Sequence, residues 1–295
     1  MSNVLKQIHM GVKNYLKRGL EYVISGKPQY NITAEIKTIG YNELLKGRVA
    51  LITGGGSGIG KAIAKAFSRS GATVVVAGRN IDRLNECCDE IRNDVGCDIP
   101  IFPLQLDLNR VDEFEEKIFE SLTKAKVANF DLLVNNGGIL GNTSLDCSAE
   151  DFDKVISTNL RGTFFLSRIV AMKMVDGGVK GNIINIASSS SLRPAANPYT
   201  ISKWGIRGLT LGMAKKLIPY GIVVNGIAPG PVATPMMGKD SLSNIGLPKN
   251  PSGRFALAEE IANMAVILTS DIGRMVVGDI LYMTGGAGVI TYDDI

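Results

Sequence analysis

The sequence is nearly devoid of histidine, the residue on which many catalytic and metal sites depend. Its one histidine, His9, lies close to the N-terminus, far in sequence from the four cysteines. No two of the cysteines form a Cys-x-x-Cys pair; they are Cys87, Cys88, Cys97 and Cys147. Zinc sites need such ligands at short spacings, and Ser-His-Asp hydrolases need a histidine beside the nucleophile. We therefore expect no metal site and no serine hydrolase, and we expect the cysteines to be reduced thiols of a cytoplasmic protein.

The sequence also lacks long apolar runs and a strong charge of either sign. No stretch of 18 apolar residues occurs, which predicts no membrane span. Residues 1–27 lack the compact apolar core and the small-residue cleavage site of a signal peptide. The net charge of +4 is too small to indicate nucleic-acid binding, and no basic stripe is interleaved with aromatic residues. With 45 % hydrophobic and 20 % charged residues, the composition is typical of a globular protein.

The first 45 residues differ in pattern from the rest, so we divide the chain into an N-terminal extension, 1–45, and a main domain, 46–295. Apolar residues recur in the extension at helical spacing; they are Leu5, Ile8, Val12, Tyr15, Leu16, Leu20 and Val23. Several lysines and arginines make the segment basic. We expect an amphipathic helix that packs on the main domain or on a neighbouring subunit. A less favoured alternative places residues 1–24 on an anionic membrane surface.

From Arg48 onward, short apolar runs alternate with segments of helical pattern. The expected strands are 48–53, 73–78, 101–108, 131–136, 182–188, 222–230 and 278–286. The expected helices are 59–71, 80–93, 110–126, 150–175, one that begins near residue 199, and 256–270. Because the strands are apolar throughout, this alternation predicts a parallel sheet covered by helices on both faces. The longest irregular stretch, 231–253, has the length of an active-site lid.

A glycine-rich segment, TGGGSGIG at 53–60, lies between the first expected strand and the first expected helix. Its glycines follow the spacing GxxxGxG from Gly54 to Gly58 to Gly60, rather than GxGxxG. Glycine permits a tight turn and a close approach of the backbone to a ligand, and the N-terminus of the next helix attracts a pyrophosphate. The position at the first strand-to-helix junction supports a dinucleotide site.

Tyr199 and Lys203 are four residues apart at the start of an expected helix, so their side chains leave the same helical face. A phenol beside an ammonium is a poor core pair, because an ionised group resists desolvation. A catalytic role explains the pair better, because a nearby cation favours the phenolate and lowers the pKa of a tyrosine. The alternative is a surface tyrosine and lysine on an amphipathic helix.

Over residues 47–288 the chain resembles the short-chain dehydrogenase/reductase family. The matching segments, in the order of the family, are TGGGSGIG at 53–60, LDL at 106–108, NNGG at 135–138, STNLRG at 157–162, INIAS at 184–188, YTISK at 199–203 and NGIAPGPVAT at 225–234. The resemblance implies a Rossmann-type, doubly wound α/β fold and an oxidoreductase of one domain. The spacing of Tyr199 and Lys203 argues against an enoyl reductase of the same broad family.

The sequence departs from the family pattern at two places. Gly137 stands where the family more often has alanine. Eleven residues separate Ser188 from Tyr199, slightly fewer than is usual in the family. Ser189 or Ser190 could therefore supply the functional hydroxyl, although Ser188 follows its strand at the usual offset and is preferred.

The resemblance implies a catalytic set of four residues. Tyr199 would be the acid/base, and Lys203 would hold the nicotinamide ribose while lowering the pKa of Tyr199. Ser188 would form a hydrogen bond with the carbonyl or alcohol oxygen of the substrate. Asn159 would help to hold Lys203 and a chain of waters that relays the proton. The physics agrees, because hydride arrival at a carbonyl carbon develops negative charge on oxygen, which two hydroxyl donors stabilise.

The resemblance likewise implies a set of cofactor-binding residues. Asp107 would contact the adenine amine, Asn135 and Gly137 would line the adenosine ribose, and Val232 and Thr234 would meet the nicotinamide amide. The full set is Gly54, Ser57, Gly58, Ile59, Gly60, Arg79, Asp107, Leu108, Asn135, Gly137, Tyr199, Lys203, Pro229, Gly230, Val232 and Thr234.

The choice of cofactor depends on the end of the second strand. An acidic residue there would bind the ribose 2′-hydroxyl of NAD, but the sequence has Gly78 followed by Arg79. Because a guanidinium suits a 2′-phosphate, we favour NADP(H), with NAD(H) as the alternative. Arg79 could instead start the next helix or stack on adenine.

The leading hypothesis is an NADP(H)-dependent enzyme that interconverts a carbonyl and a secondary alcohol. The alternatives are a NAD-preferring alcohol dehydrogenase and a catalytically silent nucleotide-binding or scaffold protein. Apolar residues in the long irregular segment favour a hydrophobic or mixed substrate; they are Met236, Met237, Leu242, Ile245 and Leu247. The family usually forms dimers or tetramers, so we expect a homodimer or homotetramer.

Overall fold

A computed structural model of the protein describes residues 43–95, 100–238, 245–247 and 249–290. The chain divides into two compact units, 1–39 and 40–295. The first unit lies outside the described residues, and so do the helix expected near the N-terminus and Leu242 of the long irregular segment. Leu45 is fully buried in the core of the second unit, and its backbone N–H donates to the carbonyl of Ser70.

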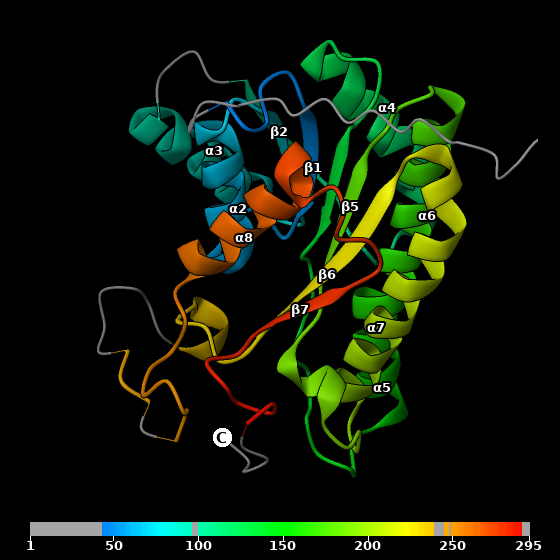
Figure 1. The fold of residues 1–295 in the computed structure, drawn as a ribbon. Coiled ribbons are helices and arrows are strands. Elements are labelled where there is room, and N and C mark those ends of the chain that lie inside the picture. The colour runs from blue at the N-terminus through cyan, green and yellow to red at the C-terminus, as the bar shows by residue number, and fades with distance from the viewer. Residues whose placement is uncertain (1–42, 96–99, 239–244, 248, 291–295) are drawn as a thin grey trace, which may run out of the picture. The chain divides into compact units, whose positions relative to one another are not determined.

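Seven parallel strands form one sheet in the order β3-β2-β1-β4-β5-β6-β7 (Figure 1). The strands are β1 (Val49–Thr53), β2 (Thr73–Gly78), β3 (Ile101–Gln105), β4 (Leu132–Asn135), β5 (Asn182–Ile186), β6 (Val223–Pro229) and β7 (Ile280–Met283). At the centre, Leu51 of β1 pairs with Val75 of β2 on one side and with Leu133 of β4 on the other. The order reverses between β1 and β4, and ligands of such sheets bind at the carboxyl ends of the strands beside this reversal. The predicted doubly wound parallel sheet is confirmed.

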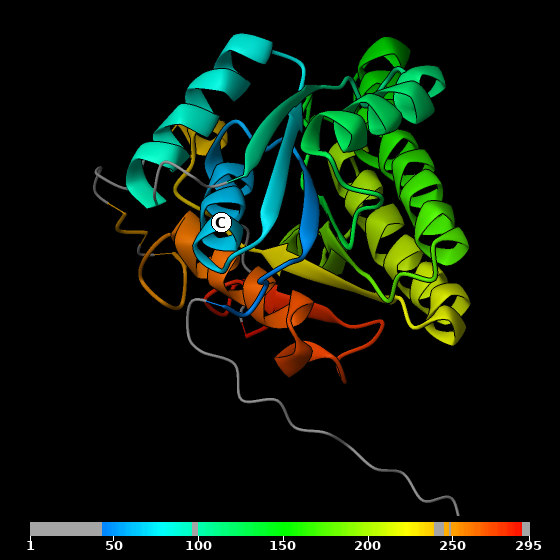
Figure 2. The same ribbon diagram turned by 90° about the horizontal axis from the view of Figure 1, so that it is seen from above.

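Helices cover both faces of the sheet (Figure 2). On one face lie α2 (Gly58–Arg69), α3 (Ile81–Val95) and α8 (Ala258–Thr269). On the other face lie α4 (Phe114–Ala125), α6 (Gly162–Asp176) and α7 (Pro198–Leu217), with α5 (Ala149–Ile156) leading into α6. Short helical segments join these elements: η1 (Val111–Glu113), η2 (Ser157–Arg161), η3 (Ser189–Leu192), η4 (Ile218–Tyr220), η5 (Pro235–Met237) and η6 (Asp271–Gly273).

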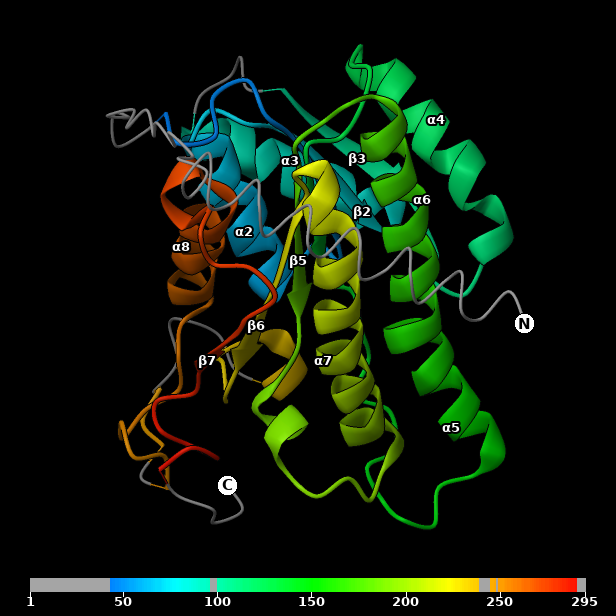
Figure 3. The ribbon, with the colours of Figure 1, turned by 45° about the vertical axis from the view of Figure 1, so that its right-hand side comes forward.

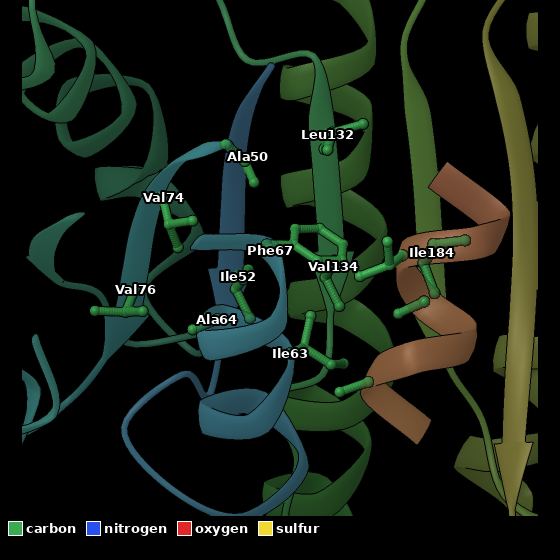
Figure 4. Close-up of a cluster of buried hydrophobic side chains, with 14 of the residues drawn as sticks. Ala50, Ile52, Ile63, Ala64, Phe67, Val74, Val76, Leu132, Val134 and Ile184 are labelled. Carbon is green, nitrogen blue, oxygen red and sulfur yellow. The ribbon is translucent and has the colours of Figure 1, made fainter. Parts of the chain in front are cut away.

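Alternation along the strands divides the core into two layers. Successive side chains of a strand point to opposite faces, so Ala50 and Ile52 pack toward α2 and α8 while Leu51 packs toward α4 and α6. Figure 4 shows the first layer, in which Phe67 and Ile63 of α2 lie against the strands. Replacing a fully buried phenylalanine such as Phe67 with alanine costs about 3–5 kcal/mol of stability. This core fixes the strand ends at which the candidate site is built.

The helix expected over 150–175 is interrupted in the structure. One π-helical turn, η2, separates α5 from α6 and contains the buried Asn159. A π-turn widens the helix by one residue per turn and occurs often at functional sites. Sequence periodicity does not resolve a single inserted residue, so the segment was predicted as one helix. No helix of the described residues is long and apolar enough to cross a membrane.

Candidate active site

The glycine-rich turn between β1 and α2 depends on the absence of side chains. Gly54 and Gly58 have φ angles of +64° and +53°, in the left-handed region that favours glycine. A Cβ atom on Gly60 would lie 2.2 Å from the carbonyl oxygen of Gly54. The Cys87 thiol donates to the carbonyl of Gly55 at 3.4 Å, and burial raises the pKa of Cys87 to about 11, which keeps the donor proton in place.

Thr53 and Asn136 hold this turn against the end of β4. The Thr53 hydroxyl accepts hydrogen bonds from the backbone N–H groups of Asn136 and Gly137, at 3.0 and 2.9 Å. The Asn136 amide donates to the carbonyls of Thr53 and Gly54, at 3.0 and 3.2 Å. Neither residue was among the sequence-predicted site residues. The adjacent residues Asn135 and Asn136 were the sequence feature that could have indicated this role. Because successive residues at the end of a strand point to opposite sides, only one of the two can face β1.

Asn135 points into the core, which differs from its expected place along the adenosine ribose. Its amide donates to the Ser167 hydroxyl at 2.7 Å and to Oδ1 of Asn185 at 2.8 Å. The side chain is 5 % exposed. The physical reason is the pleat of β4, which directs neighbouring residues to opposite sides, so that Asn136 faces the glycine-rich turn and Asn135 faces α6.

A cleft of about 250 Å³ opens at the carboxyl ends of β1, β2 and β4. Six of the predicted cofactor residues line it: Gly54, Ser57, Arg79, Asp107, Leu108 and Gly137. The sequence prediction did not include Arg83, Gly138, Ile139 and Thr158, which also line it. Oδ1 of Asp107 accepts hydrogen bonds from the backbone and side-chain amides of Asn109, which fix its carboxylate. The backbone of the glycine-rich turn, a carboxylate and an arginine thus surround one concave site, in which a few polar groups can orient a ligand.

Gly137 replaces the family's more usual alanine because Leu108 occupies the space. A Cβ atom on Gly137 would lie 2.8 Å from Cδ1 of Leu108 and 3.3 Å from Oγ1 of Thr53. Both distances are too short for a carbon side chain without movement of a neighbour.

The other predicted cofactor residues outside α7 lie in the first turn of α2 or in the chain that follows β6. Ile59 and Gly60 belong to the first turn of α2. Pro229 ends β6, and the backbone N–H of Gly230 donates to the carbonyl of Met283. Val232 and Thr234 are buried. Thr234 lies beside Gly58, since a Cβ atom built on Gly58 would be 3.4 Å from the Thr234 methyl group. The end of β6 and the glycine-rich turn are thus neighbours.

Helix α7 begins at the residues that place Tyr199. Oδ1 of Asn197 caps the helix by accepting from the backbone N–H of Thr200 at 2.9 Å, and Pro198 occupies the first helical position. Both are favoured helix-start residues. Figure 3 shows that the chain leaving β5 turns through a short helical segment and enters α7 from the same edge of the sheet. This connection brings Ser188 beside Tyr199.

Ser188 is the serine that contacts Tyr199. The hydrogen bond between the two side chains lowers the pKa of Tyr199, while the larger effect of burial raises it. The Ser188 hydroxyl also accepts from the backbone N–H of Ser190 at 3.1 Å, which begins η3. Ser189 lies buried within η3.

Lys203 is 7 % exposed, and its ammonium donates to the carbonyl of Ile186 at 2.9 Å. Its Nζ atom lies 5.5 Å from the centroid of the Tyr199 ring. Burial lowers the pKa of Lys203 to about 8. Burial raises the pKa of Tyr199 and its hydrogen bond with Ser188 lowers it, and the expected effect of Lys203 on this pKa stays a prediction. The lysine directs its proton at the carbonyl of Ile186.

Asn159 joins the cleft to α7 through its side-chain hydrogen bonds. Its Oδ1 atom accepts from the backbone N–H of Ile139 at 2.8 Å, and its amide donates to the carbonyl of the same residue at 2.9 Å. The amide also donates to the hydroxyl of Ser202 at 3.1 Å. Ile139 lines the cleft, and Ser202 directly precedes Lys203 in α7. Asn159 therefore connects the cleft lining with the helix that carries Lys203.

The arrangement offers two hydroxyl donors, Ser188 and Tyr199, at the edge of the sheet where the cleft opens. A carbonyl oxygen that meets Ser188 and Tyr199 would be polarised by both. Among the described residues, no group of three or more histidine, cysteine, aspartate or glutamate side chains is gathered as metal ligands. The geometry therefore supports acid/base chemistry at an oxygen atom.

Comparison with known proteins identifies the family. The pattern of the short chain dehydrogenase family matches residues 48–244. The chain is 34 % identical over 247 residues to the 3-oxoacyl-[acyl-carrier-protein] reductase FabG of Thermotoga maritima, covering 82 % of this chain and 98 % of that protein. It is 33 % identical to the gluconate 5-dehydrogenase of Gluconobacter oxydans, over 83 % of this chain and 96 % of that protein.

Solved structures agree with the sequence comparisons. The crystal structure of a variant actinorhodin polyketide ketoreductase with NADPH matches with a TM-score of 0.73 and 29 % identity, covering 82 % of this chain and 97 % of that one. The chain therefore belongs to the short-chain dehydrogenase/reductase family, as the sequence motifs predicted.

Proposed function

We propose that the protein is an NADP(H)-dependent oxidoreductase that interconverts a carbonyl and a secondary alcohol. The observation that carries this proposal is the contact of Ser188 with Tyr199 above the buried Lys203, next to a cleft lined by glycines. A scaffold protein would have no need to bury a lysine whose pKa burial lowers to about 8. The family membership supports an enzyme, and the intact set of four residues supports turnover.

The residues of the cleft fit a dinucleotide. A Cβ atom on Gly54 or Gly55 would come within 3.0 Å of Asn136 or Val76, so these glycines let the turn pack closely against β2 and the end of β4. The turn leads into the N-terminus of α2, which attracts a pyrophosphate. Asp107 and Gly137 would hold the adenosine, and Val232 and Thr234 would meet the nicotinamide end. When bound, the nicotinamide supplies the hydride in reduction or accepts it in oxidation.

Tyr199 is the acid in reduction and the base in oxidation. Its raised pKa keeps the phenol protonated and ready to donate to the substrate oxygen as negative charge develops there. Ser188 donates a second hydrogen bond to the same oxygen. Lys203 holds the nicotinamide ribose, and Asn159 keeps the neighbouring Ser202 in place.

The preference for NADP(H) is supported by Arg79, which follows β2 where a NAD-binding member would place a carboxylate. Arg79 lines the cleft and its guanidinium is exposed. The structure of the related ketoreductase holds NADPH. The alternative remains a NAD-preferring alcohol dehydrogenase, which the same Tyr199 and Lys203 would serve.

We assign a hydrophobic or mixed carbonyl substrate to the space beyond β6. Met236 and Met237 of η5 are 55 % and 49 % exposed, and two adjacent flexible thioether side chains can adapt to apolar groups of a substrate. The relatives include a reductase of acyl chains and a dehydrogenase of a polar sugar acid by name, so the substrate must be identified by assay.

The experiment that tests the proposal is Tyr199→Phe, assayed on a panel of ketones with NADPH. The change removes one hydroxyl and little volume, so NADPH binding should stay within about twofold while kcat falls by at least about a hundredfold. Ser188→Ala should lower kcat less. Near wild-type kcat in Tyr199→Phe would overturn the assignment of the acid.

A further inference from the structure

Trp204, the only tryptophan of the chain, stands directly after Lys203 in α7. Its side chain is 41 % exposed, yet its indole N–H donates to the backbone carbonyl of Arg193 at 2.8 Å. Indole has this one donor and no acceptor, so the bond determines how the ring is oriented. Arg193 ends η3, which packs on α7 (Figure 3). The bond therefore joins the helix of Tyr199 to the short segment that follows Ser188.

Arg207 supports the indole ring from the next turn of α7. Its Cζ atom lies 5.3 Å from the centroid of the Trp204 ring, within the range of a cation–π contact. Its Nη1 atom donates to the backbone carbonyl of Ser191 at 3.3 Å. Two side chains of α7 thus hold two carbonyls at the C-terminal end of η3.

The hydrogen bonds of η3 connect this end to Ser188. The Ser188 hydroxyl accepts from the backbone N–H of Ser190 at 3.1 Å, and the Ser188 carbonyl accepts from the Ser191 hydroxyl at 2.7 Å. At the other end, the backbone N–H of Arg193 donates to the carbonyl of Ser190 at 3.2 Å. A 3₁₀ helix is short and its hydrogen bonds have poor geometry, so support from outside determines where it lies. A shift of Arg193 is therefore passed on to Ser188.

The connection from η3 to α7 is closed at its base by the Trp204 bond. Residues 194–196 of this connection are exposed. The bond ties Arg193 to the helix that the connection enters. From the sheet, the Tyr282 hydroxyl of β7 lies 3.4 Å from the hydroxyl of Ser191. η3 is thus held between β7 and α7, and its bond to Trp204 is the shorter of the two.

We infer that Trp204 is a positioning residue, whose indole N–H holds η3 so that Ser188 and Tyr199 meet at one substrate oxygen. The inference rests on the proposed function, in which the two hydroxyls share that oxygen. Helix α7 carries Tyr199 itself, and through Trp204 it also sets the place of Ser188. A misplacement of about 1 Å can lower a rate about a hundredfold, so one N–H that does not touch the substrate affects turnover.

Three variants of the full-length chain isolate the indole N–H. Trp204→Phe removes the donor and keeps an aromatic ring beside Arg207. Trp204→His retains a donor, because Nε2 of imidazole has the same place in the five-membered ring as the indole nitrogen. Leu211→Ala is the matched control, since it removes an exposed apolar side chain about two turns further along the same face of α7.

Hydrogen exchange of backbone amides, followed by mass spectrometry, measures the order of η3 without any turnover. The amides of Ser190, Ser191 and Arg193 are hydrogen-bonded in this segment. We expect the peptides that cover residues 188–198 to exchange about tenfold faster in Trp204→Phe, the effect of one lost hydrogen bond. Trp204→His and Leu211→Ala should stay within about twofold of wild type.

Steady-state kinetics on the ketone panel with NADPH measure the consequence for Ser188. Trp204→Phe should lower kcat about tenfold and change the Kd for NADPH less than twofold, because Trp204 lies outside the residues that line the cleft. Trp204→His should recover most of the kcat, and Leu211→Ala should keep it.

The outcomes separate this inference from the proposed function. A wild type that reduces no ketone of the panel overturns the proposed function, and the role of Trp204 falls with it. If the wild type is active and Trp204→Phe keeps its kcat, with or without faster exchange, only the role of Trp204 is overturned. A loss in Leu211→Ala equal to that in Trp204→Phe would assign the effect to the helix surface and would overturn it too. So would a Trp204→His variant that is no better than Trp204→Phe, because the donor would then be without effect.

Discussion

At the scale of one residue, burial changes the pKa of Lys203. A lysine with 7 % exposure and a single carbonyl partner is costly to charge, and its pKa falls from 10.5 to about 8. The half-buried Tyr199 shifts in the opposite sense, so its phenol stays protonated. The pKa values of the two groups, which ordinarily lie close together, are therefore moved apart.

The pH dependence of stability provides a test of the buried lysine. Between pH about 8 and 10.5 the unfolded chain still binds the Lys203 proton while the native chain has released it, so this group makes the free energy of unfolding rise with pH. We compare the free energy of unfolding of the wild type with that of Lys203→Met. Across that pH window the difference should change by about 3 kcal/mol, with the wild type gaining stability relative to the variant. Urea unfolding at several pH values measures it. A difference independent of pH would mean that Lys203 keeps an ordinary pKa.

Thr53 offers a second test at the residue scale. Its hydroxyl accepts two backbone hydrogen bonds from the end of β4. Thr53→Val, at nearly constant volume, removes the partner of the Gly137 N–H, whereas the Asn136 N–H keeps its bond to the carbonyl of Val134. We expect a loss of about 2 kcal/mol in stability and a weaker Kd for NADPH, because the glycine-rich turn loses its support. Thr53→Ser, which retains the hydroxyl, is the control and should stay close to wild type. Equal behaviour of the valine and serine variants would contradict the role of the hydroxyl.

At the scale of one element, the start of α7 determines where Tyr199 lies. Asn197→Ala removes the cap on Thr200 and should destabilise the protein by about 1 kcal/mol, while Asn197→Asp should retain most of the stability. The alanine variant should also lower kcat more than it raises KM, since the helix end that carries Tyr199 becomes less ordered. Urea unfolding and steady-state kinetics of the two variants give the comparison. An alanine variant as stable and as active as the aspartate variant would argue against the cap.

The helices and strands themselves could largely be predicted from the sequence. The seven strands and the helices between them followed from apolar runs and helical periodicity, and the order of motifs indicated the family. The π-turn at Asn159 could not be predicted, because one extra residue in a turn leaves the apolar pattern nearly unchanged. The exchange of roles between Asn135 and Asn136 depends on the pleat of β4, whose end the sequence left uncertain by a residue. Arg83 was missed because it reaches the cleft from α3, whereas the sequence motifs of the site lie at the ends of strands.

At the scale of the whole molecule, the outer faces of α6 and α7 support the proposed homo-oligomer. The two helices lie side by side in Figures 1 and 3. Phe164 and Met172 of α6 and Trp204 and Leu211 of α7 are all exposed. A monomer rarely leaves such apolar groups in water. Leu211→Glu should therefore halve the mass measured by light scattering, whereas Phe119→Glu on α4 should leave it unchanged. An unchanged mass in both variants would place the interface elsewhere.

The N-terminal extension provides the last test, and its helix stays a prediction from sequence. Deletion should end at residue 39 rather than 45, because Leu45 is fully buried in the main core and its loss would unfold more than the extension. We expect the truncated chain to bind NADPH within about twofold of wild type, since every residue of the cleft lies beyond residue 50. We also expect it to melt at a lower temperature or to change its mass, because an amphipathic helix with an apolar stripe needs a covering surface. If instead the full-length chain alone co-sediments with anionic vesicles and is released by high salt, the extension binds membranes. Unchanged mass, unchanged melting and no vesicle binding would contradict both roles.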